Sequence, residues 1–199
     1  IEKRKFSEDF KEMLLLIVKP LTLIFIISIF LYVLIEQSFQ TWFPTFYTAI
    51  IYAPASMAVQ AGAVLGGAFM IGRFLGGFIL NKVKWIYLLS FCLVASAILI
   101  ILVLPLSGNS STEGLITWTN APAVVYLMPL IGLFLAPVYP TINSTILSSL
   151  PKHMHSSMAG LIVVFSALGG TTGSIITGNV FQKYDGATAF YLSLIPLTG

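Results

Sequence analysis

Residues 98–104 read Ile98-Leu99-Ile100-Ile101-Leu102-Val103-Leu104, a run with an apolar side chain at every position. A segment that is apolar all round has no face to turn to water, so it belongs in a large protein core or in a lipid bilayer. The chain of 199 residues is 57% hydrophobic and only 9% charged, whereas soluble domains carry about 25% charged residues. The composition therefore excludes a soluble domain and indicates a membrane protein.

Six apolar segments are candidates for membrane-spanning helices, because about 20 helical residues cross about 30 Å of hydrocarbon. They cover residues 20–43, 58–80, 85–106, 122–149, 157–181 and a last segment that starts near residue 187. A β-barrel would instead alternate polar and apolar residues over strands of about ten residues. The sequence therefore predicts an all-α transmembrane fold, a six-helix bundle over residues 20–199 whose last helix is truncated.

Basic residues are distributed unevenly between the two ends of these segments. The polar lead-in over residues 1–19 and the turns at 81–84 and 151–155 share one side, which holds Lys3, Arg4, Lys5, Lys11, Lys19, Lys82, Lys84 and Lys152. The opposite loops hold only Lys183. Because Lys and Arg are enriched in cytoplasmic loops, we expect the first side to be cytoplasmic in a multi-pass protein of the inner membrane. On the opposite side, we expect residues 45–56 to lie on the membrane surface.

Several function classes are excluded by what the sequence lacks. Basic residues do not gather on one solvated face, which argues against nucleic-acid binding. The single cysteine, Cys92, permits no disulfide framework and is interpreted as core packing. His153 and His155 are interpreted as a polar turn rather than a metal site, because no carboxylate accompanies them. No motif for a zinc hydrolase, a serine hydrolase or a phosphate-binding loop is present, so we expect neither an enzyme nor a bound cofactor.

Weaker patterns concern the outer loop and the chain ends. Asn109-Ser110-Ser111 matches the glycosylation acceptor pattern, which matters only in an organism with a secretory pathway. The chain begins at Ile1 rather than Met and stops at Gly199 inside an apolar segment. We therefore expect it to be part of a longer polypeptide.

Glu36 is the residue most indicative of function, because an uncompensated carboxylate inside a span costs several kcal/mol. Gln40 follows one helical turn later on the same face, and Gln37 and Thr41 flank that face. This polar patch is suited to a hydroxyl-rich ligand or to proton coupling. The alternative is that Glu36 is solvated near the outer interface or forms a structural bond to another helix.

Arg73 lies two turns before the cytoplasmic end of its segment. Its side chain is expected either to extend to the membrane interface or to pair with an acidic group on a neighbouring helix or cytoplasmic turn. We expect such a pair to stabilise one transport conformation rather than to bind the solute. Small residues recur every four positions in this helix and in the fifth; these are Ala58, Gly62, Gly66, Ala68, Gly72, Gly76, Gly169 and Gly173. Such spacing lets helices approach closely in lipid.

Two prolines interrupt the fourth segment. Pro137 and Pro140 remove backbone donors and are expected to bend the helix, which leaves carbonyl groups in need of partners. Discontinuous helices of this kind line substrate cavities in transporters. Tyr139 and Asn143 are therefore candidates for substrate contact, although a kinked packing helix would also explain the pattern.

Three stretches resemble the C-terminal half of a major facilitator superfamily transporter. Gly72-Arg73-Phe74-Leu75-Gly76-Gly77 followed by Asn81-Lys82-Val83-Lys84 resembles the superfamily signature between the eighth and ninth helices, with Asn81 where an acidic residue is often found. The stretches at 36–44 and 132–142 are similar to the seventh and tenth helices of the fucose–proton symporter group of sugar permeases. The resemblance covers nearly the whole chain.

The resemblance implies a twelve-helix fold in which this chain supplies six helices and the missing N-terminal half supplies the others. Residues 1–19 would end the cytoplasmic linker, and the helices containing Glu36 and Asn143 would face a central cavity. The function that the resemblance implies is secondary active transport of a small polar solute, a sugar taken up with protons. The acids that carry protons in that group lie in the other half, so Glu36 need not be the coupling residue. An efflux or organic-anion carrier, or a receptor or anchor that transports nothing, remains an alternative.

Overall fold

The computed structural model describes residues 15, 17–107 and 116–198, and all regular secondary structure in these ranges is helical. The glycosylation pattern at Asn109, most of the lead-in and Gly199 lie outside the described residues. The helices are α2 (Pro20–Ala49), α3 (Ala55–Leu80), α4 (Trp85–Val103), η1 (Leu104–Ser107), α5 (Ala123–Leu135), α6 (Val138–Ser149), η2 (Lys152–Met154), α7 (His155–Lys183), α8 (Gly186–Tyr191) and α9 (Leu194–Thr198). The all-α prediction is confirmed.

Five helical stretches within the described ranges are long and apolar enough to cross a membrane. They are Pro20–Ala49, Ala55–Leu80, Trp85–Ser107, Ala123–Ser149 and Lys152–Lys183, and a shorter apolar stretch follows at Gly186–Leu197. These stretches match the six predicted segments in order. Their limits differ from the predicted ones by up to six residues, the largest difference being at the end of the first stretch.

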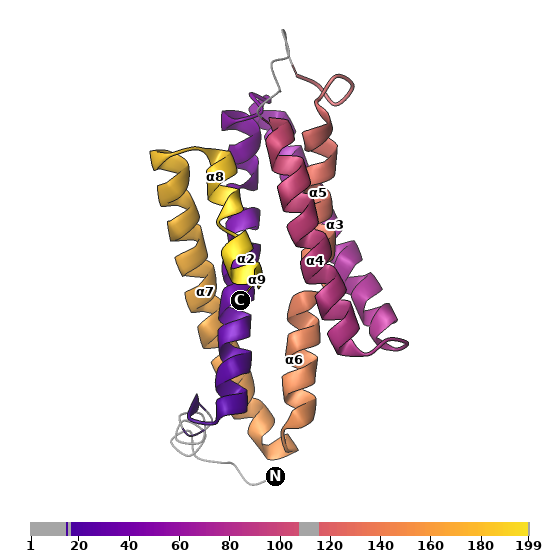
Figure 1. Ribbon diagram of the computed structural model, residues 1–199, viewed down its shortest axis with the longest axis vertical. Coiled ribbons are helices and arrows are strands. Elements are labelled where there is room, and N and C mark those ends of the chain that lie inside the picture. The colour runs from indigo at the N-terminus through magenta and orange to yellow at the C-terminus, as the bar shows by residue number, and fades with distance from the viewer. Residues whose placement is uncertain (1–14, 16, 108–115, 199) are drawn as a thin grey trace.

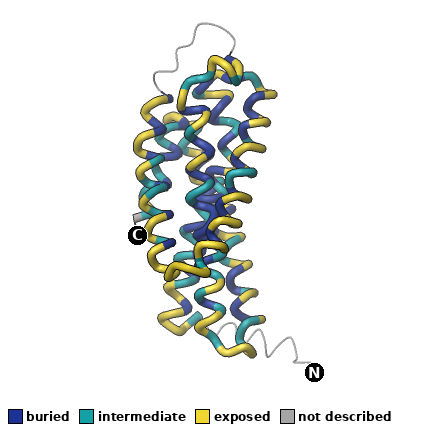
Figure 2. The backbone as a smooth tube through the Cα atoms, turned by 90° about the vertical axis from the view of Figure 1, so that its right-hand side faces the viewer, coloured by how far each residue is buried: buried dark blue, intermediate teal, exposed yellow. Residues whose placement is uncertain are grey.

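The helices form an elongated bundle with two groups (Figure 1). Helices α2 and α7, with α8 and α9 beside them, make one group, and α3, α4 and α5 make the other, with α6 continuing below α5. Helix α2 packs against both α7 and α3, so it joins the two groups, while α5 packs against α3 and α4. Buried residues follow the interior of the bundle and exposed ones its outside (Figure 2).

The outer end of α2 corrects the expectation of a surface stretch at residues 45–56. The helix continues through Pro44 to Ala49, and Phe46, Tyr47 and Ile51 are completely buried. The Tyr47 hydroxyl donates to the carbonyl of Val125 at 2.5 Å. Of the four large side chains in this stretch, Phe46, Tyr47, Ile51 and Tyr52, only Tyr52 is exposed, and its φ is positive at 59°. The prediction was wrong because these residues belong to the core, where Tyr47 bonds to α5 and Phe46 packs on Phe190 of α8, rather than to the membrane interface.

The predicted interruption of the fourth segment is confirmed. Helix α5 ends at Leu135 and α6 begins at Val138, so the break falls at Ala136 and Pro137. Pro140 lies in the first turn of α6, where a missing N–H costs no helical hydrogen bond. The break frees carbonyl groups in the last turn of α5, and a partner for one of them comes from another helix.

The small residues divide into close contacts and open positions. A Cβ atom on Gly72 would collide with the Leu133 carbonyl oxygen, and one on Gly76 would lie 2.5 Å from the Pro137 Cβ. Gly169 and Gly173 likewise face the α2 backbone at Phe30 and Leu34. These four glycines are the close contacts of α3 with the α5–α6 break and of α7 with α2, as their spacing predicts.

The other stripe on α3 does not make such a contact. A Cβ on Gly66 would have no heavy atom within 4 Å, and one on Gly62 would make an ordinary contact at 3.5 Å with Pro44. The expectation of a tight helix contact was therefore wrong at these two positions. The spacing is the same in both stripes, but only the second approaches a neighbouring helix so closely that a Cβ atom would collide with it.

Candidate functional site

The clearest polar cluster joins α2 to α3 inside the membrane-spanning part of the bundle. Glu36 is 7% exposed, and its Oε1 forms an ion pair with the guanidinium of Arg73 on α3. Gln40, one turn further along α2, donates from its Nε2 to the same oxygen at 3.1 Å. Of the two expected behaviours of Arg73, pairing with an acidic group on a neighbouring helix is confirmed. A buried carboxylate is tolerated here because a positive charge and an amide donor compensate it.

A pocket of about 490 Å³ opens beside this cluster, between α2 and α3. Arg73 and Gln40 line it with Gly62, Gly66, Phe69 and Met70. The side chain of Arg73 is 48% exposed and its guanidinium lies 5.8 Å from the centre of the Phe69 ring. Because a guanidinium has five N–H donors, donors remain for a ligand in the pocket. Gly66 has no side chain and no heavy atom within 4 Å of where a Cβ would lie, so this wall of the pocket has space for a ligand.

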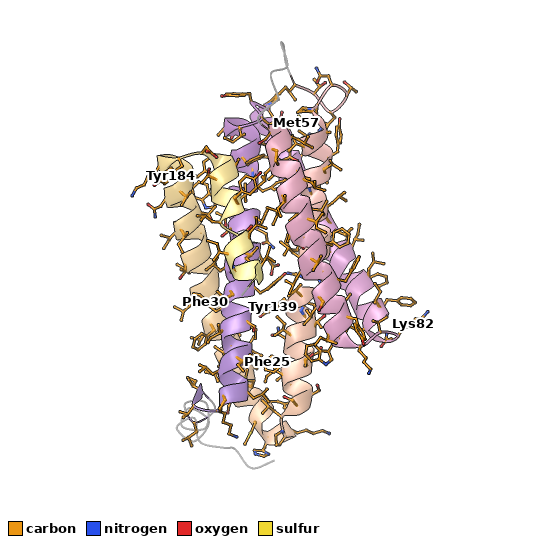
Figure 3. The ribbon with its side chains drawn as sticks, in the orientation of Figure 1. Phe25, Phe30, Met57, Lys82, Tyr139 and Tyr184 are labelled. Carbon is orange, nitrogen blue, oxygen red and sulfur yellow. The ribbon has the colours of Figure 1, made fainter. Side chains whose placement is uncertain are left out.

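Two tyrosines connect the cluster to the broken helix. Tyr32 lies one turn before Glu36 on α2, and its hydroxyl donates to the Leu135 carbonyl at 2.9 Å. This bond satisfies one of the carbonyl groups that the α5–α6 break leaves without an intrahelical partner. The Tyr32 ring stacks on Tyr139 of α6, with 6.1 Å between centroids. Figure 3 shows Tyr139 at the upper end of α6, near the middle of the bundle.

Gln37 faces a different pocket, which lies between α2 and α7. This second pocket of about 420 Å³ is lined by Gln37 and Thr41 of α2 and by several small polar residues of α7, namely Ser166, Thr171 and Ser174. Gln37 donates to the Thr41 hydroxyl at 3.1 Å. The hydroxyl of Tyr139 is 3.2 Å from that of Ser166, so α6 also reaches this side of α7.

Asn143 lies on α6, one turn after Tyr139. Its Oδ1 is buried and has no hydrogen-bond partner in the described part of the chain. A buried amide oxygen without a partner carries a desolvation cost of about 1–3 kcal/mol. The oxygen therefore does not make the structural bond to a neighbouring helix that would account for Asn143 as a packing residue.

A comparison with protein-family models finds one match. Residues 2–174 match the model described as Major Facilitator Superfamily, which covers most of the chain. The chain belongs to the major facilitator superfamily. This is a family of secondary transporters rather than enzymes. Searches of curated proteins and of solved structures give no match for the chain.

Membership of the major facilitator superfamily agrees with where the structure places the polar residues. Glu36, Gln40 and Arg73 come together across α2 and α3, and Tyr139 joins them through Tyr32. Gln37 is separated from this cluster because it points toward α7. The residues predicted to act on conformation do not form one group either. Gly72, Gly76 and Pro137 make the contact between α3 and the α5–α6 break, whereas Pro140 lies beyond the break, in the first turn of α6.

Sequence reasoning overlooked Tyr32 and the polar residues of α7. Tyr32 could have been found, because it lies four residues before Glu36 and therefore on the same face of a helix. Ser166, Thr171 and Ser174 sit among glycines in an apolar segment, which is a weaker signal. At the first residue of α7, the Nε2 atom of His155 lies 3.0 Å from the Leu150 carbonyl oxygen, which is in keeping with a polar turn. No group of three or more possible metal-binding side chains occurs in the described ranges.

Proposed function

We propose that this chain is half of a twelve-helix transporter that takes up a small, neutral, hydroxyl-rich solute of the sugar class together with protons. The Glu36–Arg73 pair with Gln40 is the observation that supports this proposal. The pair has no net charge, and it presents both acceptors and donors beside an open pocket of about 490 Å³. A polyol could bond to such a site without bringing an uncompensated charge into the membrane.

The polar residues are concentrated on faces of α2, α3 and α7 that carry the two polar pockets. Gln40 and Arg73 line one of these pockets, and Gln37 lines the other. We propose that these faces line the central cavity opposite a second six-helix half, with Tyr139 and Asn143 at its inner wall. Binding would then shift the balance between inward-open and outward-open states, because only differential affinity moves such an equilibrium. The lead-in over residues 1–19 would be the cytoplasmic linker between the halves.

Within this proposal Arg73 acts on conformation and Glu36 on both binding and conformation. The unpaired Oδ1 of Asn143 supports a contact with the solute, since a hydroxyl group could supply the missing donor. Proton coupling follows the resemblance to the fucose–proton symporter group and does not depend on Glu36 alone. Glu36→Gln would therefore be expected to weaken solute binding, and to change the pH dependence of uptake only if Glu36 also carries the proton.

The test is counterflow in liposomes with the full-length protein that contains this chain. Radiolabelled neutral sugars should exchange, and Glu36→Gln and Asn143→Leu should raise the half-saturation concentration by about tenfold, which corresponds to about 1.4 kcal/mol for one hydrogen bond. Thr48→Val is the matched control, because Thr48 is exposed on the same helix and its hydroxyl bonds only to carbonyls of its own helix. Exchange of organic anions or drugs without sugars would instead identify an efflux or organic-anion carrier. No exchange of any solute, combined with a bound protein partner, would favour a receptor or anchor.

A further inference from the structure

A separate apolar groove lies between α3 and α4, on a side of α3 different from the one that carries Arg73. One wall consists of Leu75 and Ile79 of α3 and the other of Tyr87 and Phe91 of α4. The floor is the α5–α6 break, where Leu133, Phe134 and Pro137 lie against Gly72 and Gly76. Cys92, a residue that is 2% exposed, closes the inner end. The groove exists because α3 and α4 both pack on α5 and touch each other little.

The groove is suited to hydrocarbon rather than to water or a polar solute. Its volume is about 220 Å³ and apolar side chains form almost all of its surface. Apolar cavities of about 150 Å³ remain dry and take up apolar molecules, because water inside them lacks hydrogen-bond partners. The outer walls are exposed at membrane depth, with Leu75 44%, Tyr87 65% and Phe91 61% exposed. An acyl chain could therefore enter from the side.

Positive charge is placed at the mouth of this groove. Val83, which lines the groove, lies between Lys82 and Lys84 in the turn that joins α3 to α4. The Lys82 ammonium lies 5.1 Å from the centre of the Phe78 ring, and neither lysine has an acidic partner among the described side chains. Figure 3 shows Lys82 at the tip of this turn, away from the end that carries Met57. This is the end that the distribution of basic residues predicts to be cytoplasmic.

We propose that the groove between α3 and α4 is a binding site for one anionic phospholipid. One acyl chain would lie between the walls with its end near Cys92, and the phosphate would contact Lys82 and Lys84. Charge complementarity selects this occupant, because the mouth is basic and cytoplasmic leaflets carry anionic lipids. The site does not depend on which solute the protein transports.

Headgroup recognition is tested on the full-length protein, stripped of lipid in detergent and titrated with phosphatidylglycerol. Removing both lysines with Lys82→Gln and Lys84→Gln should weaken binding about thirtyfold, from about 1 kcal/mol for each lysine near an anionic headgroup. Lys152→Gln, a change of one lysine in the other turn of the same side, should leave this binding unchanged. Equal affinity for phosphatidylcholine with the same chains, or no effect of the double substitution, would overturn the proposal.

Occupation of the groove is tested through the Cys92 thiol. Phosphatidylglycerol should slow the alkylation of Cys92 by N-ethylmaleimide at least severalfold, whereas glycerol phosphate, which has no acyl chain, should not. Ile79→Trp fills the groove from its rim, where Ile79 is 38% exposed, and should abolish lipid binding. Ile86→Trp is the control, because Ile86 is half exposed near the same turn but does not line the groove. Protection by glycerol phosphate, or unchanged lipid binding by Ile79→Trp, would show that no chain occupies the groove.

Discussion

The contact between Gly76 and Pro137 gives the sharpest test of the packing. A Cβ atom on Gly76 would lie 2.5 Å from the Cβ and 3.0 Å from the Cγ of Pro137, whereas one on the adjacent Gly77 would have no heavy atom within 4 Å. The two glycines belong to the same helix and are both followed by further helical residues. Gly76→Ala and Gly77→Ala therefore differ in packing while they share the same change in backbone entropy.

The expected magnitudes follow from these distances. Carbon atoms attract best at about 3.5–4.0 Å, so the new methyl group at Gly76 overlaps Pro137 by about 1 Å. The proline ring is rigid, and α3 must move away from the α5–α6 break to relieve the overlap. Overpacking of this kind costs about 1–3 kcal/mol. Gly77→Ala meets open space and should stabilise by about 0.5–1 kcal/mol, because alanine loses less backbone entropy than glycine in a helix.

The assay is unfolding of the purified protein in mixed micelles, titrated with a denaturing detergent and followed by tryptophan fluorescence. The free energy of unfolding of Gly76→Ala should lie about 1–3 kcal/mol below that of Gly77→Ala, because the gain in backbone entropy is common to both variants and only the overpacking differs. Equal free energies for the two variants, or a more stable Gly76→Ala, would refute the argument that α3 packs on Pro137 through a small residue.

Two further predictions concern the polar contacts of α2. A double-mutant cycle over Glu36→Gln and Arg73→Gln should give a coupling energy of about 1–3 kcal/mol in the same titration, because each single variant leaves one charge without its counter-ion. A coupling energy below about 0.3 kcal/mol would show that the pair does not hold α2 on α3. Tyr32→Phe should cost about 1–3 kcal/mol because it leaves the buried Leu135 carbonyl unpaired. Tyr52→Phe, at a site 78% exposed, should change the free energy of unfolding by less than about 0.5 kcal/mol, and an equal loss in both variants would contradict the role of Tyr32.

The features predicted correctly from the sequence are those that local chemistry determines. The apolar segments predicted the membrane-spanning helices, because in lipid a helix satisfies all backbone hydrogen bonds within one segment. The break at Ala136 and Pro137 followed from proline, which cannot donate its backbone nitrogen. The position of Glu36 inside a span followed from its place within the first apolar segment.

The features that could not be predicted depend on contacts between distant segments. Arg73 and Glu36 are 37 residues apart, and their pairing requires the rotation and register of α2 on α3. Gly62 and Gly66 have the same spacing as Gly72 and Gly76, but only at the second pair does a neighbouring helix come close enough to exclude a Cβ atom. The C-terminal end of α2 was predicted at residue 43 instead of Ala49 for a related reason. Pro44 ends a helix in isolation, but burial of the residues that follow stabilises its continuation.

Helix α3 explains why the polar and apolar pockets do not merge. Consecutive helical residues point about 100° apart, so Gly72 faces the α5–α6 break while Arg73 faces α2. The absence of a side chain at Gly72 brings the backbone of α3 close to Leu133, and the ion pair holds the neighbouring side of the same turn against α2. A larger residue at Gly72 would collide with the Leu133 carbonyl oxygen and push α3 away from the break. The close glycine contact therefore holds α3 in a rotation that places the apolar groove on one side of the helix and the charged pair on the other.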